Sequence, residues 1–321
     1  MKVVTFGEAL FRTSTLSGER LAQAQQMNFF LGGSELNLAA NLNSLGVNAE
    51  WVSALPAGLT GQLIREKVTA LGVRTSHCYD LNDPQVGWYL MESGSAPRPD
   101  VVYHRNASAL AKANDFKFNW AVILKDADLF HSSGITAGLS ENLTTEVKKA
   151  MRTAKDMGVL VSYDLNYRKN IWSLESFVER QKDIFDRIDI LFCAKSDLQL
   201  FFNESFDDDN FSSVFAKSKV QILVMTQRSP DNSEYGMTVV TAREKFFSSK
   251  YKINAVDRIG VGDSAAAGFL KMYLTSTDLS IAAEWAAIAG ALKYGIRGDM
   301  ALLKEVDLKN ILESRHSGVI R

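Results

Sequence analysis

Short apolar runs alternate with helical stretches along most of the chain, and this alternation restricts the possible folds more than any other feature. The first run, KVVTF at residues 2–6, is β-branched and ends at Gly7, which is typical of a buried strand. Residues 34–45 then place apolar side chains at helical spacing, and Gly46 follows where a C-terminal cap belongs. Because parallel strands are connected through helices that cover the sheet, the alternation predicts an α/β fold.

The same alternation continues towards the end of the sequence. Further strands are predicted at 49–55, 127–134 (ending in a loop), 159–166, 189–194, 220–226, 237–241 and 245–249. Further helices are predicted at 61–72, 140–158 (with Ser140 as N-cap), 173–188, 263–276, 280–294 and 303–314. The 321 residues could form two small domains or one large one, but no Pro/Gly/Ser-rich linker and no repeat divides them. We therefore expect residues 1–321 to form one α/β domain, a mostly parallel, doubly wound sheet flanked by helices.

Two insertions, at about 10–31 and 85–108, depart from this pattern. The second contains VGWYLME and DVVYHR, two short runs rich in aromatic and β-branched residues, which SGSAPRP connects. The glycine and prolines of this connection are typical of a hairpin turn. The first insertion is also aromatic and irregular, so it is a candidate to pair with that hairpin. The two insertions together predict a small β-rich lid outside the main sheet.

Composition excludes several classes of partner. The formal net charge is -1, so bulk charge favours neither nucleic acid nor an anionic membrane. The sequence has no apolar run of membrane-spanning length, and its first residues enter a strand-like run without a signal-peptide segment. The two cysteines and four histidines have no metal-like spacing. We expect a cytoplasmic protein that binds neither nucleic acid nor a membrane.

The stretch VDRIGVGDSAAAGFL, residues 256–270, is the clearest candidate for a functional site. Glycines at 260 and 262 allow unusual backbone angles and a close approach of a ligand. The N–H groups of Gly260, Val261 and Gly262, at the start of a helix, favour a bound anion. Asp263 is interpreted as the N-cap of this helix, as a base that accepts a proton from a substrate hydroxyl, or as both, since both roles need a residue at the helix start. The stretch is not a P-loop, because no GxxxxGK[ST] occurs, and it lies too late in the chain for a dinucleotide fingerprint.

Two motifs at opposite ends of the chain resemble a known family. DRIGVGDSAAAG (257–268) resembles the second signature of the PfkB (ribokinase-like) sugar kinases, D-x-x-G-A-G-D-x-F-x-x-G, with Val261 in place of alanine. GGSELNLAANLNSLG (32–46) resembles the first signature of the same family. The resemblance spans nearly the whole chain. It implies a ribokinase-like fold with a lid, ATP and Mg²⁺ as cofactors, Asp263 as the catalytic base, and a homo-oligomer formed through the lid.

Further segments resemble the 2-keto-3-deoxygluconate kinases within that family. YHRNASA (103–109) and DLNYR (164–168) resemble their Y-x-R-x-x-S-A and D-x-N-x-R segments, and Arg258 stands where ribokinases carry threonine. The resemblance implies a sugar site formed by Gly33, Tyr89, Tyr103, Arg105, Arg168 and Asp299. The chemistry agrees, because arginine offers a forked donor to the carboxylate of an acid sugar and tyrosine an amphipathic wall. Each residue also has a structural interpretation: packing for the tyrosines, a surface charge for Arg105, a pair with Asp164 for Arg168, a loop residue for Asp299 and a turn for Gly33.

The nucleotide side departs from the family pattern. The usual N-x-x-E reads AKSD, with Asp197 in the acidic position, and the usual T-x-G segment reads TQRSPDNSEYG. The resemblance still implies an ATP site formed by Asn166, Thr226, Arg228, Gly260 and Gly262. No side chain is expected to bind a metal directly, because Mg²⁺ would arrive on ATP, with Asp197 able to contact it through water.

The resemblance implies an ATP-dependent kinase that phosphorylates the primary C6 hydroxyl of 2-keto-3-deoxygluconate. One alternative is a fructokinase or another ketose kinase of the same family. A second is a sugar-binding sensor with little catalytic activity, which only the altered AKSD and TQRSPDN segments favour. A nucleoside kinase would have little use for the two arginines.

Overall fold

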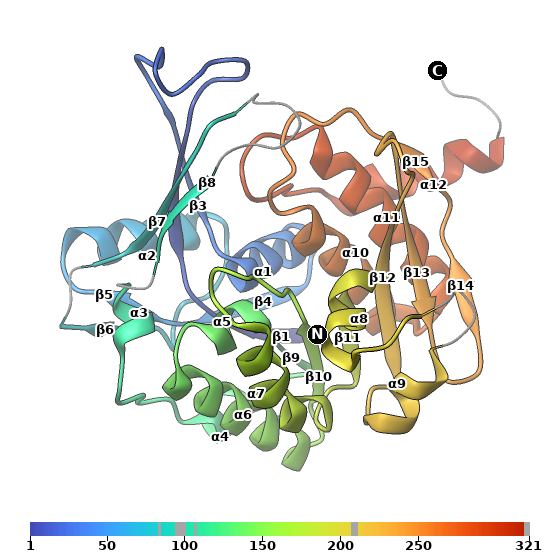
Figure 1. Ribbon diagram of the computed structural model, residues 1–321, viewed down its shortest axis with the longest axis horizontal. Helices are drawn as coiled ribbons and strands as arrows, with labels where there is room; N and C mark the ends of the chain where they lie inside the picture. Colours follow the sequence, from blue (N-terminus) through green and yellow to red (C-terminus); the bar gives the residue numbers. More distant parts are fainter. Residues whose placement is uncertain (83–84, 94–100, 106–107, 207–210, 318–321) are drawn as a thin grey trace.

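The computed structural model describes residues 1–82, 85–93, 101–105, 108–206 and 211–317. Its centre is a nine-stranded sheet in the order β14-β13-β12-β11-β10-β9-β1-β4, with β15 paired to β13 (Figure 1). The strands from β12 to β4 along this order run parallel: β1 (Lys2–Phe6), β4 (Asn48–Val52), β9 (Leu129–Ser133), β10 (Leu160–Asp164), β11 (Ile190–Cys193) and β12 (Ile222–Arg228). Three further strands join antiparallel: β13 (Glu234–Val240), β14 (Lys245–Phe247) and β15 (Tyr251–Lys252).

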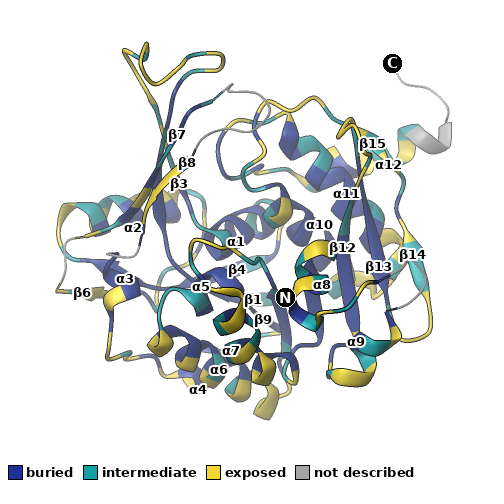
Figure 2. Cartoon of the chain, viewed as in Figure 1, coloured by how far each residue is buried: buried dark blue, intermediate teal, exposed yellow. Residues whose placement is uncertain are grey.

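Helices cover both faces of this sheet. Adjacent strand residues point to opposite faces, so Val3 belongs to one hydrophobic core and Val4 to the other. The core of Val3 includes α1 (Ser34–Ser44), α2 (Leu59–Ala70), α10 (Val261–Ser276), α11 (Leu279–Tyr294) and α12 (Glu305–Ser317). The core of Val4 includes α3 (Ala109–Lys112), α4 (Trp120–Ile123), α5 (Gly134–Gly138), α6 (Glu141–Asp156), α7 (Leu174–Phe185), α8 (Lys195–Phe202) and α9 (Ser212–Lys217). Figure 2 shows the central strands as buried between these layers, which confirms the predicted doubly wound α/β fold.

Some elements differ from the prediction. The expected strand at 49–55 is divided, because the chain leaves the main sheet after β4 and β5 (Ala54–Pro56) pairs instead with β6 (Tyr79–Leu81). The loop expected after β9 is the short helix α5. Ser140 caps α6 as predicted, since its hydroxyl accepts a hydrogen bond from the N–H of Leu143. No helix in the described part of the chain has both the length and the apolar character that crossing a bilayer requires.

A separate four-stranded sheet forms the lid. Its order is β3-β2-β7-β8, with bounds Asn28–Gly32, Leu10–Ser14, Gly87–Met91 and Val101–His104. The two insertions meet where β2 pairs in parallel with β7, which places Arg12 beside Tyr89. Figure 1 shows this sheet standing beside the main body at the upper left. The two insertions form a β-rich sheet outside the main sheet, as expected, and residues 94–100 of its connection lie outside the described residues.

Candidate active site

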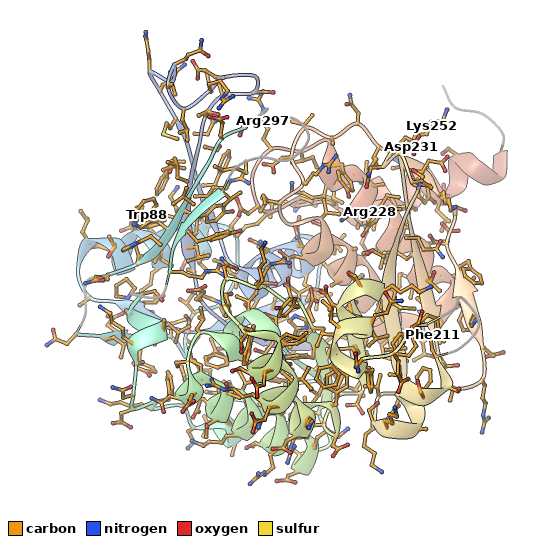
Figure 3. All side chains as sticks on the ribbon, viewed as in Figure 1. Trp88, Phe211, Arg228, Asp231, Lys252 and Arg297 are labelled. Atoms are coloured by element: carbon orange, nitrogen blue, oxygen red, sulfur yellow. The ribbon has the colours of Figure 1, made fainter. Side chains whose placement is uncertain are left out.

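A cavity of about 300 Å³ lies between the lid and the carboxyl ends of the parallel strands. β10, β11 and β12 contribute Asp164, Cys193 and Thr226 to its lining, and the lid contributes Leu10 and Tyr103. In Figure 3, Trp88 lies on the lid and Arg228 lies across from it at the end of β12. The structure brings into this one lining every residue assigned to a site from the sequence: Gly33, Tyr89, Tyr103, Arg105, Asn166, Arg168, Asp197, Thr226, Arg228, Gly260, Val261, Gly262, Asp263 and Asp299.

The segment of residues 257–263, which we call the phosphate turn, opens helix α10. Gly260 has a left-handed backbone with φ of 78°, and a Cβ there would lie 1.9 Å from the carbonyl oxygen of Asp299. Only glycine fits this close approach. Among the described residues, and apart from its chain neighbours and its own helix backbone, no heavy atom lies within 4 Å of the position that a Cβ on Gly262 would take, so the turn faces open space at that residue. The first N–H groups of a helix have no partner within it, so a phosphate fits here.

The interpretation of Asp263 as the N-cap of this helix is wrong. Helix α10 begins at Val261 and its N-cap is Gly260, so Asp263 lies inside the first turn. Its side chain contacts α1. The hydroxyl of Ser34 donates to Oδ1 at 2.9 Å, and the amide of Asn37 donates to Oδ2 at 2.7 Å.

Burial makes the Asp263 carboxyl weakly acidic. Desolvation raises its pKa from 3.8 to about 6, against the opposing hydrogen bonds from Asn37 and Ser34. Oδ1 accepts the hydrogen bond from Ser34 and Oδ2 the one from Asn37; a carboxylate oxygen has two lone pairs, so each can accept another hydrogen bond. At neutral pH the group is ionised with a pKa near the ambient pH, which is the condition that suits a general base.

Ser34 and Asn37 hold the Asp263 carboxyl, and the sequence analysis assigned neither of them to a site. Both lie in α1 directly after Gly33, whose φ of 148° permits the abrupt start of the helix. A Cβ on Gly33 would lie 2.1 Å from the carbonyl oxygen of Glu8, so this glycine also allows close packing. Asn37 belongs to the first signature, and that motif was the only signal for its role.

Asp299 and Tyr89 contact each other at the lid side of the cavity. The Tyr89 hydroxyl donates to Oδ1 of Asp299 at 2.7 Å, and the guanidinium of Arg12 lies 3.2 Å from Oδ2. Arg12 also pairs with Asp257 at 2.6 Å and is fully buried. The sequence analysis missed Arg12, because an arginine in an irregular insertion is typical of an exposed surface.

Arg105 is buried, so its interpretation as a surface charge is wrong. Its side chain lies 3.2 Å from Glu8, and its guanidinium lies 5.1 Å from the centre of the Tyr103 ring. Burial raises the pKa of Glu8, while Arg105 acts to lower it. Tyr103 is 39% exposed, so its ring can form part of the cavity wall.

The strand ends opposite the lid carry the remaining polar residues. Arg168 is exposed and donates to the carbonyl oxygen of Tyr167 at 3.3 Å. Burial, followed by the charge of Asp263, raises the pKa of Asp164 to about 8, while Arg168 acts to lower it. Asn166 has a left-handed backbone with φ of 41°, and its amide approaches the Ser34 hydroxyl at 3.4 Å.

The AKSD segment begins a helix. Ala194 is the N-cap of α8 and makes no side-chain cap, while Asp197 accepts a hydrogen bond from the N–H of Tyr167 at 3.3 Å. Burial raises the pKa of Asp197. Within the described ranges, no group of three or more His, Cys, Asp or Glu side chains is arranged to hold a metal ion. Asp197 lines the cavity beside this segment, so it could reach an ion carried in by a nucleotide.

Comparisons with known proteins agree with this geometry. Residues 1–305 match the family described as pfkB family carbohydrate kinase. A 2-dehydro-3-deoxygalactonokinase of Haloferax volcanii is 30% identical over 324 residues, covering 100% of this chain and 99% of the relative.

Solved structures share the fold. The crystal structure of 2-dehydro-3-deoxygluconokinase from Thermotoga maritima has a TM-score of 0.92 and 30% identity, over 98% of each chain. That of fructokinase with bound ATP from Xylella fastidiosa has a TM-score of 0.84 and 18% identity, over 98% of this chain and 99% of the other. The likeness confirms the predicted ribokinase-like fold, and the chain belongs to the pfkB family of carbohydrate kinases.

Proposed function

We propose that this carbohydrate kinase transfers the γ-phosphoryl group of ATP to the primary C6 hydroxyl of 2-keto-3-deoxygluconate. One observation carries the proposal: Asp263, held by Ser34 and Asn37, lies in the same cavity as the phosphate turn and two arginines suited to a sugar acid. The relatives named as 2-dehydro-3-deoxygalactonokinase and 2-dehydro-3-deoxygluconokinase support the class of substrate. They differ in the sugar, so the epimer at C4 is part of what the experiment decides.

Asp263 accepts the proton of the attacking hydroxyl. Ser34 and Asn37 fix the plane of its carboxylate from α1, which leaves an acceptor direction on each oxygen for the sugar. The pKa of about 6 keeps the carboxylate ionised at neutral pH and still basic enough to take a proton as the phosphoryl group transfers.

The phosphate turn stabilises the charge of the transferring group. The N–H groups of Gly260, Val261 and Gly262 surround the start of α10, whose dipole favours negative charge. When bound, Mg²⁺ would neutralise charge on the ATP phosphates. Residues that would hold the nucleotide are Asn166, Thr226, Arg228, Gly260 and Gly262, with Asp197 reaching the metal through water.

The lid side of the cavity would hold the sugar. Arg105 and Arg168 supply donors for the carboxylate, and Tyr89 and Tyr103 supply walls against which the sugar chain packs. Asp299 and Gly33 complete the sugar site. Because the lid borders the cavity, its closure would exclude water and suppress hydrolysis of ATP. We also propose that residues 1–321 act as one domain, that copies of the chain associate through the lid, and that the protein acts in the cytoplasm.

The test is an assay of ADP release over a panel of sugars. The panel holds 2-keto-3-deoxygluconate, its C4 epimer, fructose and ribose, each with ATP and Mg²⁺. We expect the sugar acids to give kcat/KM at least about tenfold above the neutral sugars. Preference for fructose would favour a fructokinase instead. Binding of a sugar acid without ADP release would favour a sensor and overturn the proposed phosphoryl transfer.

A further inference from the structure

Lys293 is a fully buried lysine in α11 that the sugar and nucleotide sites leave unexplained. Lysine side chains are almost never fully buried unless they are paired, because an ammonium group removed from water needs compensating partners. Burial lowers the pKa of Lys293, and the neighbouring carboxylate of Asp257 acts to raise it. The partners of its ammonium group therefore indicate what this charge does.

Two backbone carbonyls accept hydrogen bonds from the Lys293 ammonium. The oxygen of Ile296 lies at 2.8 Å and that of Asp257 at 3.4 Å. Asp257 begins the phosphate turn, and Ile296 begins the segment that leads to Asp299. The ammonium group thus joins two stretches of main chain that both border the cavity.

The same two stretches are in contact at the phosphate turn itself. Asp257 accepts hydrogen bonds from the N–H of Ile259 at 3.1 Å and from the N–H of Gly298 at 3.0 Å. The carbonyl of Asp299 lies directly behind Gly260, where a Cβ would be 1.9 Å from its oxygen. A shift of either stretch therefore moves the N–H groups at 260–262 that face the cavity.

The charges around Lys293 are paired across these stretches. Arg12 reaches Asp257 at 2.6 Å and Asp299 at 3.2 Å, so two buried cations face two buried carboxylates. Arg12 holds the carboxylates, whereas Lys293 holds the carbonyls. Removing the ammonium would leave carbonyl dipoles converging on a buried space with no cation to receive them.

We propose that Lys293 is a positioning residue, a built-in cation that fixes the geometry of the phosphate turn from behind. Converging backbone carbonyls are the ligands that bind K⁺ elsewhere in proteins, and here a covalently attached ammonium takes that place. The chain therefore sets its phosphate turn without a monovalent cation from solution. This inference rests on the proposed function, because it concerns the anion-binding role of residues 260–262.

The experiment compares Lys293→Met, Lys293→Ala and a matched control, Lys271→Met. Lys271 is also a mostly buried lysine on a neighbouring helix, but it pairs with Glu305 away from the cavity. We expect Lys293→Met to lower kcat at least about tenfold with little change in the binding of sugar without ATP, and Lys271→Met to leave kcat unchanged. A kcat of Lys293→Met equal to that of the wild type would overturn the proposal.

Small cations give a readout that a packing role would not move. Adding about 100 mM ammonium chloride should raise the kcat of Lys293→Ala at least about fivefold. Tetramethylammonium chloride at equal ionic strength should leave that kcat unchanged. A loss of kcat that ammonium does not restore would overturn the cationic role.

The wild-type protein supplies a test that does not depend on folding of the variants. Its kcat should stay within about twofold when choline, sodium, potassium and ammonium salts are exchanged, and a larger dependence would overturn the proposal. Failure of the wild type to phosphorylate any sugar would instead contradict the proposed function itself. The two failures are therefore distinguished by the wild-type assay, which is run first.

Discussion

The guanidinium of Arg12 lies 2.6 Å from the carboxylate of Asp257 and links the lid to the phosphate turn. The same side chain lies 3.2 Å from Asp299, which in turn accepts a hydrogen bond from Tyr89 in the neighbouring lid strand. Lid and phosphate turn are thus connected through buried, charged contacts. A change in the position of β2 would reach residues 260–262 through Asp257.

Arg12→Ala should destabilise the protein strongly. It would leave Asp257 and Asp299 buried without their cation, which commonly costs about 3–5 kcal/mol. Urea unfolding measures the loss of free energy of unfolding. The control is Arg65→Ala, which breaks an exposed pair with Asp80 and should cost less than about 1 kcal/mol. Equal losses for the two variants would contradict the structural role of Arg12.

Asp263→Asn should remove the base while keeping the shape of the side chain. We expect kcat to fall about 10³-fold, because an amide cannot accept the proton of the hydroxyl, with sugar binding and the melting temperature preserved. Isothermal calorimetry with the sugar and an ADP-release assay give the two readouts. Asp278→Asn is the control, because Asp278 caps α11 and asparagine caps equally well. Near-normal turnover in Asp263→Asn would contradict the assignment of the base.

Glu35 should make the protein less stable as the pH rises. Burial raises its pKa from 4.5 to about 7, while hydrogen bonds from Ser133 and Thr136 act to lower it. A carboxyl with a raised folded-state pKa stabilises the fold below its unfolded-state pKa, and this contribution is lost as the pH climbs to about 7.

Over that pH range the free energy of unfolding of the wild type should fall. In Glu35→Gln the fall should be smaller, by on the order of 3 kcal/mol, because glutamine does not titrate. Glutamine still presents an oxygen to Ser133 and Thr136. Denaturant titrations at several pH values measure the difference. Glu141→Gln, at an exposed position, should follow the wild-type curve. Parallel curves for Glu35→Gln and the wild type would show that Glu35 does not titrate in this range.

Arg105→Ala should weaken the binding of sugar acids far more than the binding of neutral sugars. We expect KM for 2-keto-3-deoxygluconate to rise about tenfold or more and KM for fructose to change less than about threefold, since only the acid carries a carboxylate. Arg105→Lys keeps the charge beside Glu8 but loses the forked donor geometry. Its KM for 2-keto-3-deoxygluconate should lie between those of the wild type and Arg105→Ala. Equal losses for both sugars would remove the carboxylate argument.

Gly260→Ala should damage the phosphate turn. A Cβ would lie 1.9 Å from the carbonyl oxygen of Asp299, and the positive φ adds strain, so we expect a loss of about 2 kcal/mol or more and little turnover. Gly262→Ala is the control for stability. Its free energy of unfolding should change less, because that residue borders open space. A stable Gly260→Ala would show that the turn can relax around the methyl group.

The sequence predicted most of the main sheet, because buried parallel strands and amphipathic helices have different periods. It also predicted the β-rich sheet of the two insertions, since the aromatic runs at 86–92 and 100–105 are typical of strands. It did not predict the short helices α3, α4, α5, α8 and α9, which are too brief to show a clear helical period. The strand at 49–55 was wrong as a single element, because nothing local indicates that residues 54–56 pair with residues 79–81.

Within the candidate site, the motifs predicted which residues would meet but not how they are held. The N-cap interpretation of Asp263 failed because local patterns do not register that Gly260 adopts a left-handed backbone. The contacts of Asp263 with Asn37, of Arg12 with Asp257 and of Arg105 with Glu8 join distant segments, which only the tertiary fold brings together. The sequence did not indicate a role for Lys293, because its partners are two backbone carbonyls, which no side-chain pattern reveals.

The hydrogen bond from Asn37 to Asp263 also has a consequence for synthesis on the ribosome. It joins residues separated by 226 positions, and Asp257 is tied to Gly298 still later in the chain. A nascent chain that has completed β1, β4 and β9 already contains three strands that are neighbours in the finished sheet, yet its Asn37 has no Asp263 carboxylate to orient. With the role proposed for Asp263, competence for phosphoryl transfer would arise only in the last stage of translation, and a chain that ends before Asp257 would lack both the proposed base and the phosphate turn.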